Sequence, residues 1–318
     1  MKQLTVIFAI LLGVTACRQS DGGDAARRQA EVDSLAMTDP DVWRIAVMPT
    51  LECLPLVLAK DHGFFEQKGL GVVLCMYESQ MDVDTALQQQ RVDVAVTDLV
   101  RAARLQREGL LLRRYSATDA AWQLVTKRTA RIKQLKQLDD KMVAMTRYSA
   151  TDMLADMAVD SARLKSERVF RIQVNNIAVR LGMLQNDIMD AMFLPEPHAT
   201  TARNLKAQVL LDTKKMGLRL GVLVLNEDRM PGRDEQLQIF RKAYDEAVDS
   251  LNRYGCKNYA HLIQQAFGVS STTIDSLAAT APQFSHIAEP RKEDLKRVDD
   301  WWKKRQDSMR YVEKRYIQ

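Results

Sequence analysis

From residue 43 onward, short apolar runs that favour β-strands alternate with segments of helical periodicity. This alternation is typical of α/β units with parallel strands, so the sequence predicts an α/β fold. Strands are expected at 44–48, 71–77, 92–97, 110–115, 122–126, 142–145, 169–174, 188–194, 209–211 and 221–225. Helices are expected at 51–62, 85–90, 99–107, 150–163, 177–185, 236–254, 258–267, 272–279 and 291–316.

Part of this pattern occurs twice along the chain. Residues 44–48 (RIAVM) match 141–145 (KMVAM), and 91–96 (RVDVAV) match 188–193 (IMDAMF), in both cases at an offset of 97 residues. Two matches at one offset predict two lobes of similar build. The loops at the carboxyl ends of an open parallel sheet form a binding edge. Two such edges that face each other would enclose a cleft.

Composition narrows the class of protein. The 318 residues are 46% hydrophobic and 27% charged, which suits a folded chain with one or two sizeable cores and excludes collagen-like or disordered classes. The net charge of +5 is small and dispersed, so no nucleic-acid partner is expected. Four Cys and four His argue against a metal site. We expect no metal and no cofactor.

The first seventeen residues have the features of an export signal. Lys2 precedes an apolar run at 4–14 that is shorter than the roughly 20 residues of a membrane-spanning helix. The segment VTAC, which ends at Cys17, resembles the lipobox of bacterial lipoproteins, in which the cysteine is lipidated. An ordinary secretory signal is the alternative. We expect 18–42 to be a tether, and the exported body to be anchored in the cell envelope through its lipid, on the periplasmic side or at the cell surface.

Three cysteines remain after Cys17. Cys53 and Cys75 belong to neighbouring β-α units, so a disulfide between them is one alternative. Buried thiols at Cys53, Cys75 and Cys256 are the interpretation we favour.

Candidate ligand-binding residues cluster in four loops at expected strand ends. Ser149 is placed to cap the helix at 150–163, whose first N–H groups would then favour an anionic ligand group; plain capping is the alternative. Pro195 and Pro197 would stiffen the last loop. Each residue alone could be an ordinary surface residue, but their shared location supports the set. The candidates are Thr50, Glu52, Cys53, Thr97, Asp98, Arg147, Tyr148, Ser149, Thr151, Glu196 and His198.

Motifs of known catalytic chemistry are missing from the sequence. It has no Gly-x-Ser-x-Gly elbow, no glycine-rich phosphate loop and no His-Glu-x-x-His. The carboxylates of Glu52, Asp98 and Glu196 could in principle act as an acid/base set. Hydrogen bonding to a bound amine or to the backbone is the interpretation we favour, so we expect no catalytic residues.

The chain resembles the substrate-binding proteins of ABC importers, in the branch of the aliphatic sulfonate, nitrate, taurine and thiamine-precursor binders. The most specific part of the resemblance is 59–65 (AKDHGFF), supported by 92–98 (VDVAVTD), 149–152 (SATD) and 194–197 (LPEP). The resemblance implies a type II periplasmic-binding-protein fold with a two-strand hinge. Lobe 1 would be 43–116 plus 217–318, and lobe 2 would be 117–216.

The same resemblance implies a small-molecule ligand and an ABC permease as partners. It implies ligand contacts at Thr50, Glu52, Thr97, Asp98, Arg147, Ser149, Thr151 and Glu196. Because three of these are acidic, we expect a zwitterion or an amino-heterocycle, or an organic anion, rather than a small inorganic anion. Alternatives are an enzyme on the same scaffold, similar to those of menaquinone or thiamine-pyrimidine synthesis, and a ligand sensor for a membrane receptor.

An apolar stripe runs along the expected C-terminal helix. Its spacing predicts packing against a core, with docking of a partner as the alternative. The stripe consists of Leu295, Val298, Trp302, Met309, Val312 and Tyr316.

Overall fold

A computed structural model describes the backbone of residues 39–316 and the side chains of residues 39–306. The expected signal segment, the lipidation site Cys17 and nearly all of the expected tether lie outside these residues. Within 39–316, no helix combines the length and the apolar character needed to cross a membrane.

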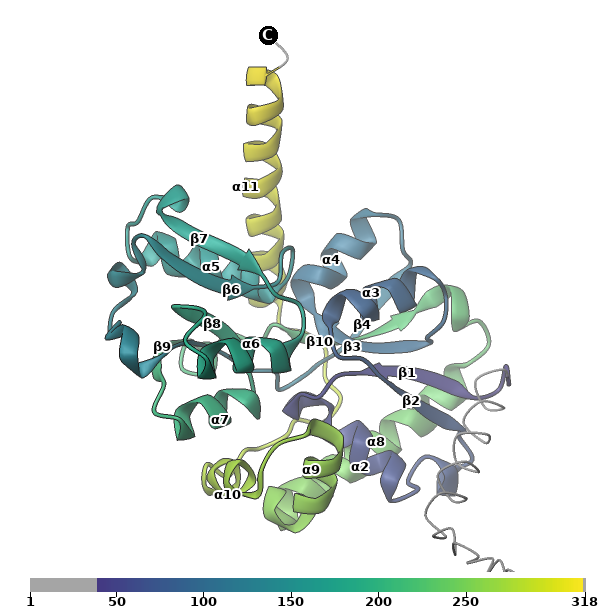
Figure 1. Cartoon of the computed structure of the whole chain (residues 1–318). Coiled ribbons are helices and arrows are strands. Elements are labelled where there is room, and N and C mark those ends of the chain that lie inside the picture. The colour runs from purple at the N-terminus through teal and green to yellow at the C-terminus, as the bar shows by residue number, and fades with distance from the viewer. Residues whose placement is uncertain (1–38, 317–318) are drawn as a thin grey trace, which may run out of the picture. The chain divides into compact units, whose positions relative to one another are not determined.

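The first lobe is built on a five-stranded sheet of order β2-β1-β3-β10-β4 (Figure 1). Strand β1 pairs in parallel with both β2 and β3, whereas β10 runs antiparallel between β3 and β4. The strands are β1 (Trp43–Val47), β2 (Val72–Met76), β3 (Val94–Asp98), β4 (Leu112–Ala117) and β10 (Gly221–Asn226).

The second lobe repeats this arrangement in the order β7-β6-β8-β5-β9. Strand β6 pairs in parallel with β7 and β8, and β5 runs antiparallel between β8 and β9. The strands are β5 (Trp122–Thr126), β6 (Lys141–Met145), β7 (Val169–Gln173), β8 (Ala191–Pro195) and β9 (Gln208–Asp212). The predicted two-lobed α/β fold is confirmed.

Each sheet differs from the expected all-parallel sheet by one strand. The reversed strands, β5 and β10, are the ones that the chain enters directly from the other lobe. Because the preceding strands β4 and β9 end at the cleft-side edge, the next strand starts at that edge and must run away from it. The crossing segments form the hinge, where Thr118 N donates to Gly221 O (3.0 Å) and Thr213 N to Trp122 O (3.1 Å).

The internal repeat is present in the structure with one correction. Strand β8 begins 97 residues after β3, but β6 begins 98 residues after β1, so the first sequence match is one residue out of register. In both lobes an aspartate accepts a hydrogen bond from a backbone N–H at the start of the lobe's central parallel strand. Asp93 Oδ2 accepts from Arg44 N (2.8 Å), and Asp190 Oδ2 accepts from Met142 N (3.0 Å).

Helices cover both sheets. One expected helix, at 51–62, is a 3₁₀ turn (Leu51–Cys53) followed by α2, because Pro55 favours the first turn of a new helix. Helix α7 is not among the expected helices, because it has only seven residues and follows two prolines. The α-helices are α2 (Leu54–Asp61), α3 (Gln80–Gln88), α4 (Leu99–Arg107), α5 (Ala150–Ser161), α6 (Ile177–Gln185), α7 (His198–Asn204), α8 (Asp234–Tyr254), α9 (Ala260–Phe267), α10 (Ser271–Ala279) and α11 (Lys292–Tyr316).

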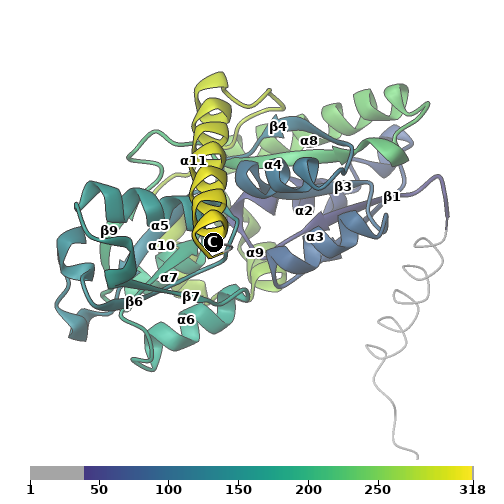
Figure 2. The ribbon, with the colours of Figure 1, turned by 90° about the horizontal axis from the view of Figure 1, so that it is seen from above.

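Two apolar cores stabilise the molecule. One lies under α2 and α8, where Phe240 stacks on Trp43 and on Phe65, each at 5.6 Å between ring centroids. The other is continuous from the opposite face of the first sheet through the second lobe to Val298, Trp301 and Trp302 of α11. Figure 2 shows α11 lying between α4 of the first lobe and α5 of the second.

Two further expectations can be compared with the structure. Val298 and Trp302 of the apolar stripe are buried, as core packing predicts, whereas the side chains of Met309, Val312 and Tyr316 lie outside the described set. Cys53, Cys75 and Cys256 form no disulfide with one another; Cys53 and Cys256 are buried and Cys75 is half-buried.

Candidate functional site

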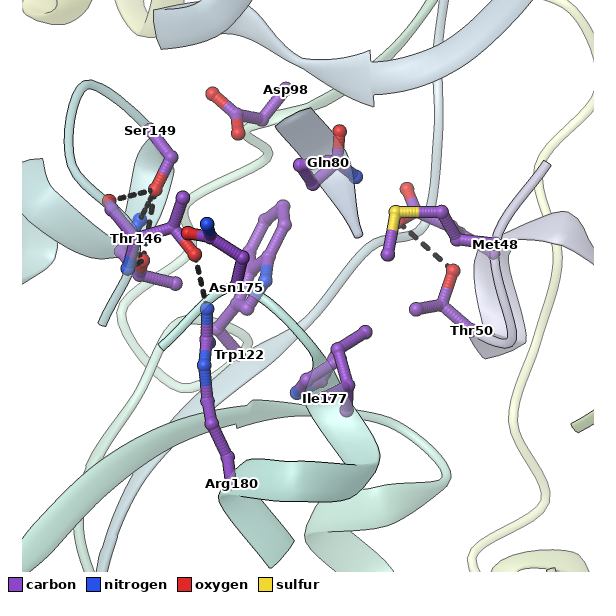
Figure 3. A pocket seen from close by; sticks show the side chains of 13 residues that line it. Met48, Thr50, Gln80, Asp98, Trp122, Thr146, Ser149, Asn175, Ile177 and Arg180 are labelled. Atoms are coloured by element: carbon purple, nitrogen blue, oxygen red, sulfur yellow. Dashed lines mark hydrogen bonds between the residues drawn. The ribbon is translucent and has the colours of Figure 1, made fainter. Parts of the chain in front are cut away.

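A cavity lies between the carboxyl ends of the strands of the two sheets (Figure 3). It contains about 400 Å³ of empty space, including the part that is open to solvent. Its wall combines polar groups with a few apolar side chains, as in many small-ligand sites. The lining residues are Met48, Thr50, Glu52, Gln80 and Asp98 from the first lobe, and Trp122, Thr146, Ser149, Thr151, Asn175, Ile177, Arg180 and Pro195 from the second.

Arg180 is a buried cation in this wall. Its side chain is on α6 and the residue is only 3% exposed. Among residues 39–306, no carboxylate forms an ion pair with it. The guanidinium donates to Val174 O (2.6 Å), to Phe193 O (2.9 Å) and to Thr146 Oγ1. Burial lowers the pKa of Arg180 to about 10, with a smaller contribution from the charge of Arg101, so the group stays protonated at neutral pH.

The neutral partners leave Arg180 with binding capacity. A guanidinium has five N–H donors, and three are used by the hydrogen bonds above. A buried charge without an opposite charge is costly to a fold. An anionic group of a ligand would supply both the missing charge and the missing acceptors.

The loop between β6 and α5 forms the adjacent wall. Ser149 caps α5: its Oγ accepts from Thr151 N (3.1 Å) and donates to Thr146 O (2.7 Å). Tyr148 has a left-handed backbone (φ 56°), and its N–H donates to Asp152 Oδ2 (2.8 Å). The hydroxyl groups of Thr146, Ser149 and Thr151 are thereby fixed at the cavity.

Glu52 lies at the hinge side of the cavity and is buried. Burial raises the pKa of Glu52 from its ordinary 4.5 to about 7, although hydrogen bonds from Thr118 and Thr50 oppose this and the charge of Asp98 adds to it. A substantial fraction of Glu52 is therefore neutral near pH 7. A neutral carboxyl can donate a hydrogen bond, so this residue does not simply repel an anion.

Asp98 connects the two lobes across the cavity. It caps α4, and its Oδ1 accepts from Arg101 N (2.9 Å) and from Ala150 N of the second lobe (3.0 Å). Burial raises the pKa of Asp98 to about 6, against the lowering effect of Arg101 and of the two backbone N–H groups. In Figure 3 Asp98 and Arg180 lie on opposite walls.

Other contacts close the lobes around the cavity. Leu51 N donates to Glu196 O (2.8 Å), and Asn176 Nδ2 donates to Glu78 Oε2 (2.7 Å). Ser79 and Asn176 also form an isolated antiparallel bridge. The structure is therefore a closed arrangement of the lobes.

Of the residues predicted from the sequence, the structure brings Thr50, Glu52, Asp98, Ser149 and Thr151 together in the cavity wall. The wall does not include Cys53, Thr97 or Arg147. Cys53 Sγ accepts from Met48 N (3.4 Å), and burial raises the pKa of its thiol to about 12. Thr97 Oγ1 donates to Gln80 Oε1 (3.2 Å), so it supports a lining residue, whereas the Arg147 side chain is exposed.

Tyr148, Glu196 and His198 are also absent from the wall. Tyr148 stacks on Trp302, with 5.9 Å between the ring centroids. The Glu196 carboxylate turns back to α7, where it accepts from Thr200 N (2.9 Å) and pairs with Arg203 (2.7 Å). His198 is buried, which lowers its pKa to about 4.

Several lining residues were missed by the sequence analysis. Arg180 is the most important, and its signal was the single cation within the apolar helix 177–185. Asn175 directly follows an expected strand and could have been found by the rule that was used for the other loops. The same rule would have found Thr146, which directly follows the expected strand at 142–145. Gln80 and Trp122 carried no comparable signal.

Within the described side chains, no group of three or more His, Cys, Asp or Glu residues could hold a metal ion. The polar groups at the cavity can bind and orient a small molecule through hydrogen bonds and through the charge of Arg180.

Comparisons with known proteins agree with this geometry. Residues 51–254 match the model of a family described as NMT1/THI5 like. No curated protein sequence matches the chain significantly. Among solved structures, the chain is similar to the periplasmic aliphatic sulphonate binding protein SsuA from Escherichia coli, at 19% identity and a TM-score of 0.70, covering 84% of this chain and 88% of that one.

Two further structures show the same fold. The alkanesulfonate-binding protein SsuA from Xanthomonas axonopodis pv. citri, bound to MOPS, gives 17% identity and a TM-score of 0.67, covering 81% of this chain and 89% of that one. The periplasmic nitrate-binding protein NrtA from Synechocystis PCC 6803 gives 14% identity and a TM-score of 0.63, covering 78% and 74%. These proteins are binding proteins by description.

Proposed function

Because this chain belongs to the NMT1/THI5-like family, we propose that it is a solute-binding protein that captures a small organic anion for an ABC importer. The observation that carries the proposal is Arg180, a buried guanidinium that faces the cavity and pairs with no carboxylate among the described side chains. The described binding of sulfonates and nitrate by proteins of the same fold supports it.

The opposite wall refines the class of ligand. Asp98 lines the cavity across from Arg180 and is an acceptor when ionised. A ligand with an anionic group at one end and an amino group at the other would satisfy both walls. We therefore place a zwitterion such as an aminosulfonate first among the organic anions.

Capture requires the lobes to move. The ligand would enter when 43–116 plus 217–318 separates from 117–216 by rotation at the hinge. It would stabilise the closed form because its anionic end contacts Arg180 of the second lobe and its amino end contacts Asp98 of the first, and only closure brings these two residues together. No bond is made or broken in this cycle, so the protein acts by binding alone.

The proposal includes attachment and delivery. Cys17 would carry a lipid, 18–42 would tether the body, and the loaded protein would dock on an ABC permease at the outer face of the membrane. Replacement Cys17→Ser should release the protein from the membrane fraction. Retention of the variant in that fraction would contradict lipid attachment.

Thermal unfolding of the body tests the ligand class. A ligand at 100 times its Kd stabilises a protein by about 2.7 kcal/mol. We expect taurine to raise Tm, ethanesulfonate to raise it less, and ethylamine to have no effect. Arg180→Gln should abolish the shifts, whereas Arg147→Gln, which removes an exposed cation from the same lobe, should keep them. A shift with ethylamine alone would overturn the proposal.

A further inference from the structure

Helix α11 contacts both lobes behind the cavity. It follows the last connection of the first lobe, where Ala117 N donates to Ala288 O (2.7 Å), and then passes between α4 and α5 (Figure 2). We refer to Trp301, Trp302 and Arg305 as the α11 latch.

The latch is fixed to the first lobe through Trp302. The indole Nε1 donates to Val100 O of α4 (3.1 Å), and the residue is 6% exposed. The Arg107 guanidinium lies over the Trp302 ring, 5.4 Å from its centroid, and pairs with Asp299 (3.4 Å). A buried aromatic ring with a hydrogen-bonded N–H and a cation on its face is a strong attachment.

The latch reaches the second lobe through two other residues. Trp301 Nε1 donates to Asp156 Oδ2 of α5 (2.7 Å). Arg305 pairs with Asp152 (3.1 Å) and with Asp156 (3.4 Å), and Asp152 is fully buried. Because Asp152 loses part of its compensating charge when Arg305 leaves, this ion pair contributes more than one on the surface.

The same residues hold the loop that forms the cavity wall. Tyr148 packs between Trp302 and Arg305, with an angle of 15° between its ring and that of Trp302 and with Arg305 at 5.2 Å from its centroid. Asp152 also accepts from Tyr148 N. The next residue is Ser149, which lines the cavity.

We propose that α11 is a latch that holds the two lobes closed without a ligand. The attachment through Trp302 moves with the first lobe, so separation of the lobes must break the contacts of Trp301 and Arg305 with α5 and unstack Tyr148. This conclusion goes beyond the proposed function, because it rests on contacts between protein groups and holds for any ligand.

Two backbone N–H groups report closure directly. Ala150 N donates to Asp98, and Leu51 N donates to Glu196 O, and both hydrogen bonds cross from one lobe to the other. Their hydrogen exchange therefore requires separation of the lobes. Ala95 and Met192 lie in central strands of the two sheets, and their N–H groups report unfolding of each lobe.

The test measures amide exchange of these four residues by NMR in the ligand-free protein. In Trp301→Phe/Arg305→Gln, exchange at Ala150 and Leu51 should accelerate about tenfold, which corresponds to a loss of about 1.4 kcal/mol of closure free energy. Ala95 and Met192 should keep their rates. Arg305→Gln alone, the milder variant, should show a smaller acceleration at the same two residues.

Arg297→Ala is the matched control, because Arg297 is an exposed cation on the same helix. It should leave all four rates unchanged. Unchanged exchange at Ala150 and Leu51 in both latch variants would overturn the proposal. Equal acceleration at all four residues would also overturn it, since α11 would then stabilise the lobes themselves rather than their contact.

Discussion

Gly221 lies directly against Glu52 at the hinge: a Cβ atom on Gly221 would be 2.7 Å from Glu52 Oε2. The same atom would be 2.1 Å from Thr118 Oγ1 and 2.4 Å from Ala120 Cβ. Glycine at this position therefore lets β10 enter the first sheet while the Glu52 carboxyl keeps its hydrogen bond from Thr118. Gly221 and Thr118 of the hinge are thus tightly packed against Glu52 of the cavity wall.

Gly221→Ala should destabilise the protein by about 1–3 kcal/mol, as overpacking usually does, and should displace the Glu52 carboxyl. Urea unfolding checks this as a lower midpoint at an unchanged slope. Gly182→Ala is the control. Gly182 is inside α6 with no atom within 4 Å of the added methyl group, so the variant should gain about 0.5–1 kcal/mol from helix propensity. Equal effects of both changes would contradict the packing argument.

Glu52 should make stability depend on pH. Its pKa is raised on folding from 4.5 to about 7, so the folded protein binds a proton that the unfolded chain releases. The resulting stabilisation is complete below pH 4.5 and is lost as the pH rises through 7, with an upper limit of about 3 kcal/mol. In Glu52→Gln the side chain does not titrate. The unfolding free energy of the wild type should therefore fall relative to that of the variant as the pH rises from 4.5 to about 7. Above pH 7 the two free energies should change with pH at the same rate. Parallel curves from pH 4.5 to 8 would contradict the assignment.

Asp93 and Asp190 occupy equivalent positions in the two lobes but differ in how much they contribute to stability. Asp93 is fully buried and pairs with Arg44 (3.1 Å), Arg229 (2.8 Å) and Arg233 (3.1 Å). Asp93→Asn should cost about 3–5 kcal/mol, because it removes a fully buried negative charge that faces three partly buried arginines. Asp190→Asn, at a half-buried carboxylate that accepts from Met142 N, should cost about 1 kcal/mol. Denaturant unfolding of both variants measures the difference, and equal losses would contradict it.

Phe240 is the centre of an aromatic cluster with Trp43 and Phe65. Phe240→Ala should cost about 3–5 kcal/mol by removing buried area and leaving a cavity. Tyr254→Ala, at a half-exposed position on the same helix, should cost less than about 1 kcal/mol. Calorimetry of the two variants compares a buried and an exposed ring on α8.

The fold could be predicted because its signals are local. Apolar runs and turns mark strands such as Trp122–Thr126, which the structure places where the sequence does. The direction of β5 and β10 depends on how the chain crosses between lobes, which no local pattern records. The short helix α7 was missed for a similar reason, because packing against α10 and β8 decides it.

The candidate site could be predicted only in part. The rule that ligand groups follow strand ends selected Thr50, Asp98 and Ser149, which the structure places in the cavity wall. It cannot tell which way a loop side chain turns, and Glu196 turns to Arg203 instead. It also overlooks residues inside helices, so Arg180 was found only when the structure showed which face of α6 meets the cavity.

Strand β10 separates β3 from β4, although it lies more than 100 residues after both in the chain. During synthesis the first sheet therefore lacks an inner strand until residues 221–226 emerge from the ribosome. All five strands of the second sheet are made between 122 and 212, without interruption. The second lobe begins later in the chain, but its sheet is the first that can be completed. The sheet of the first lobe remains incomplete between β3 and β4 until β10 has been synthesised.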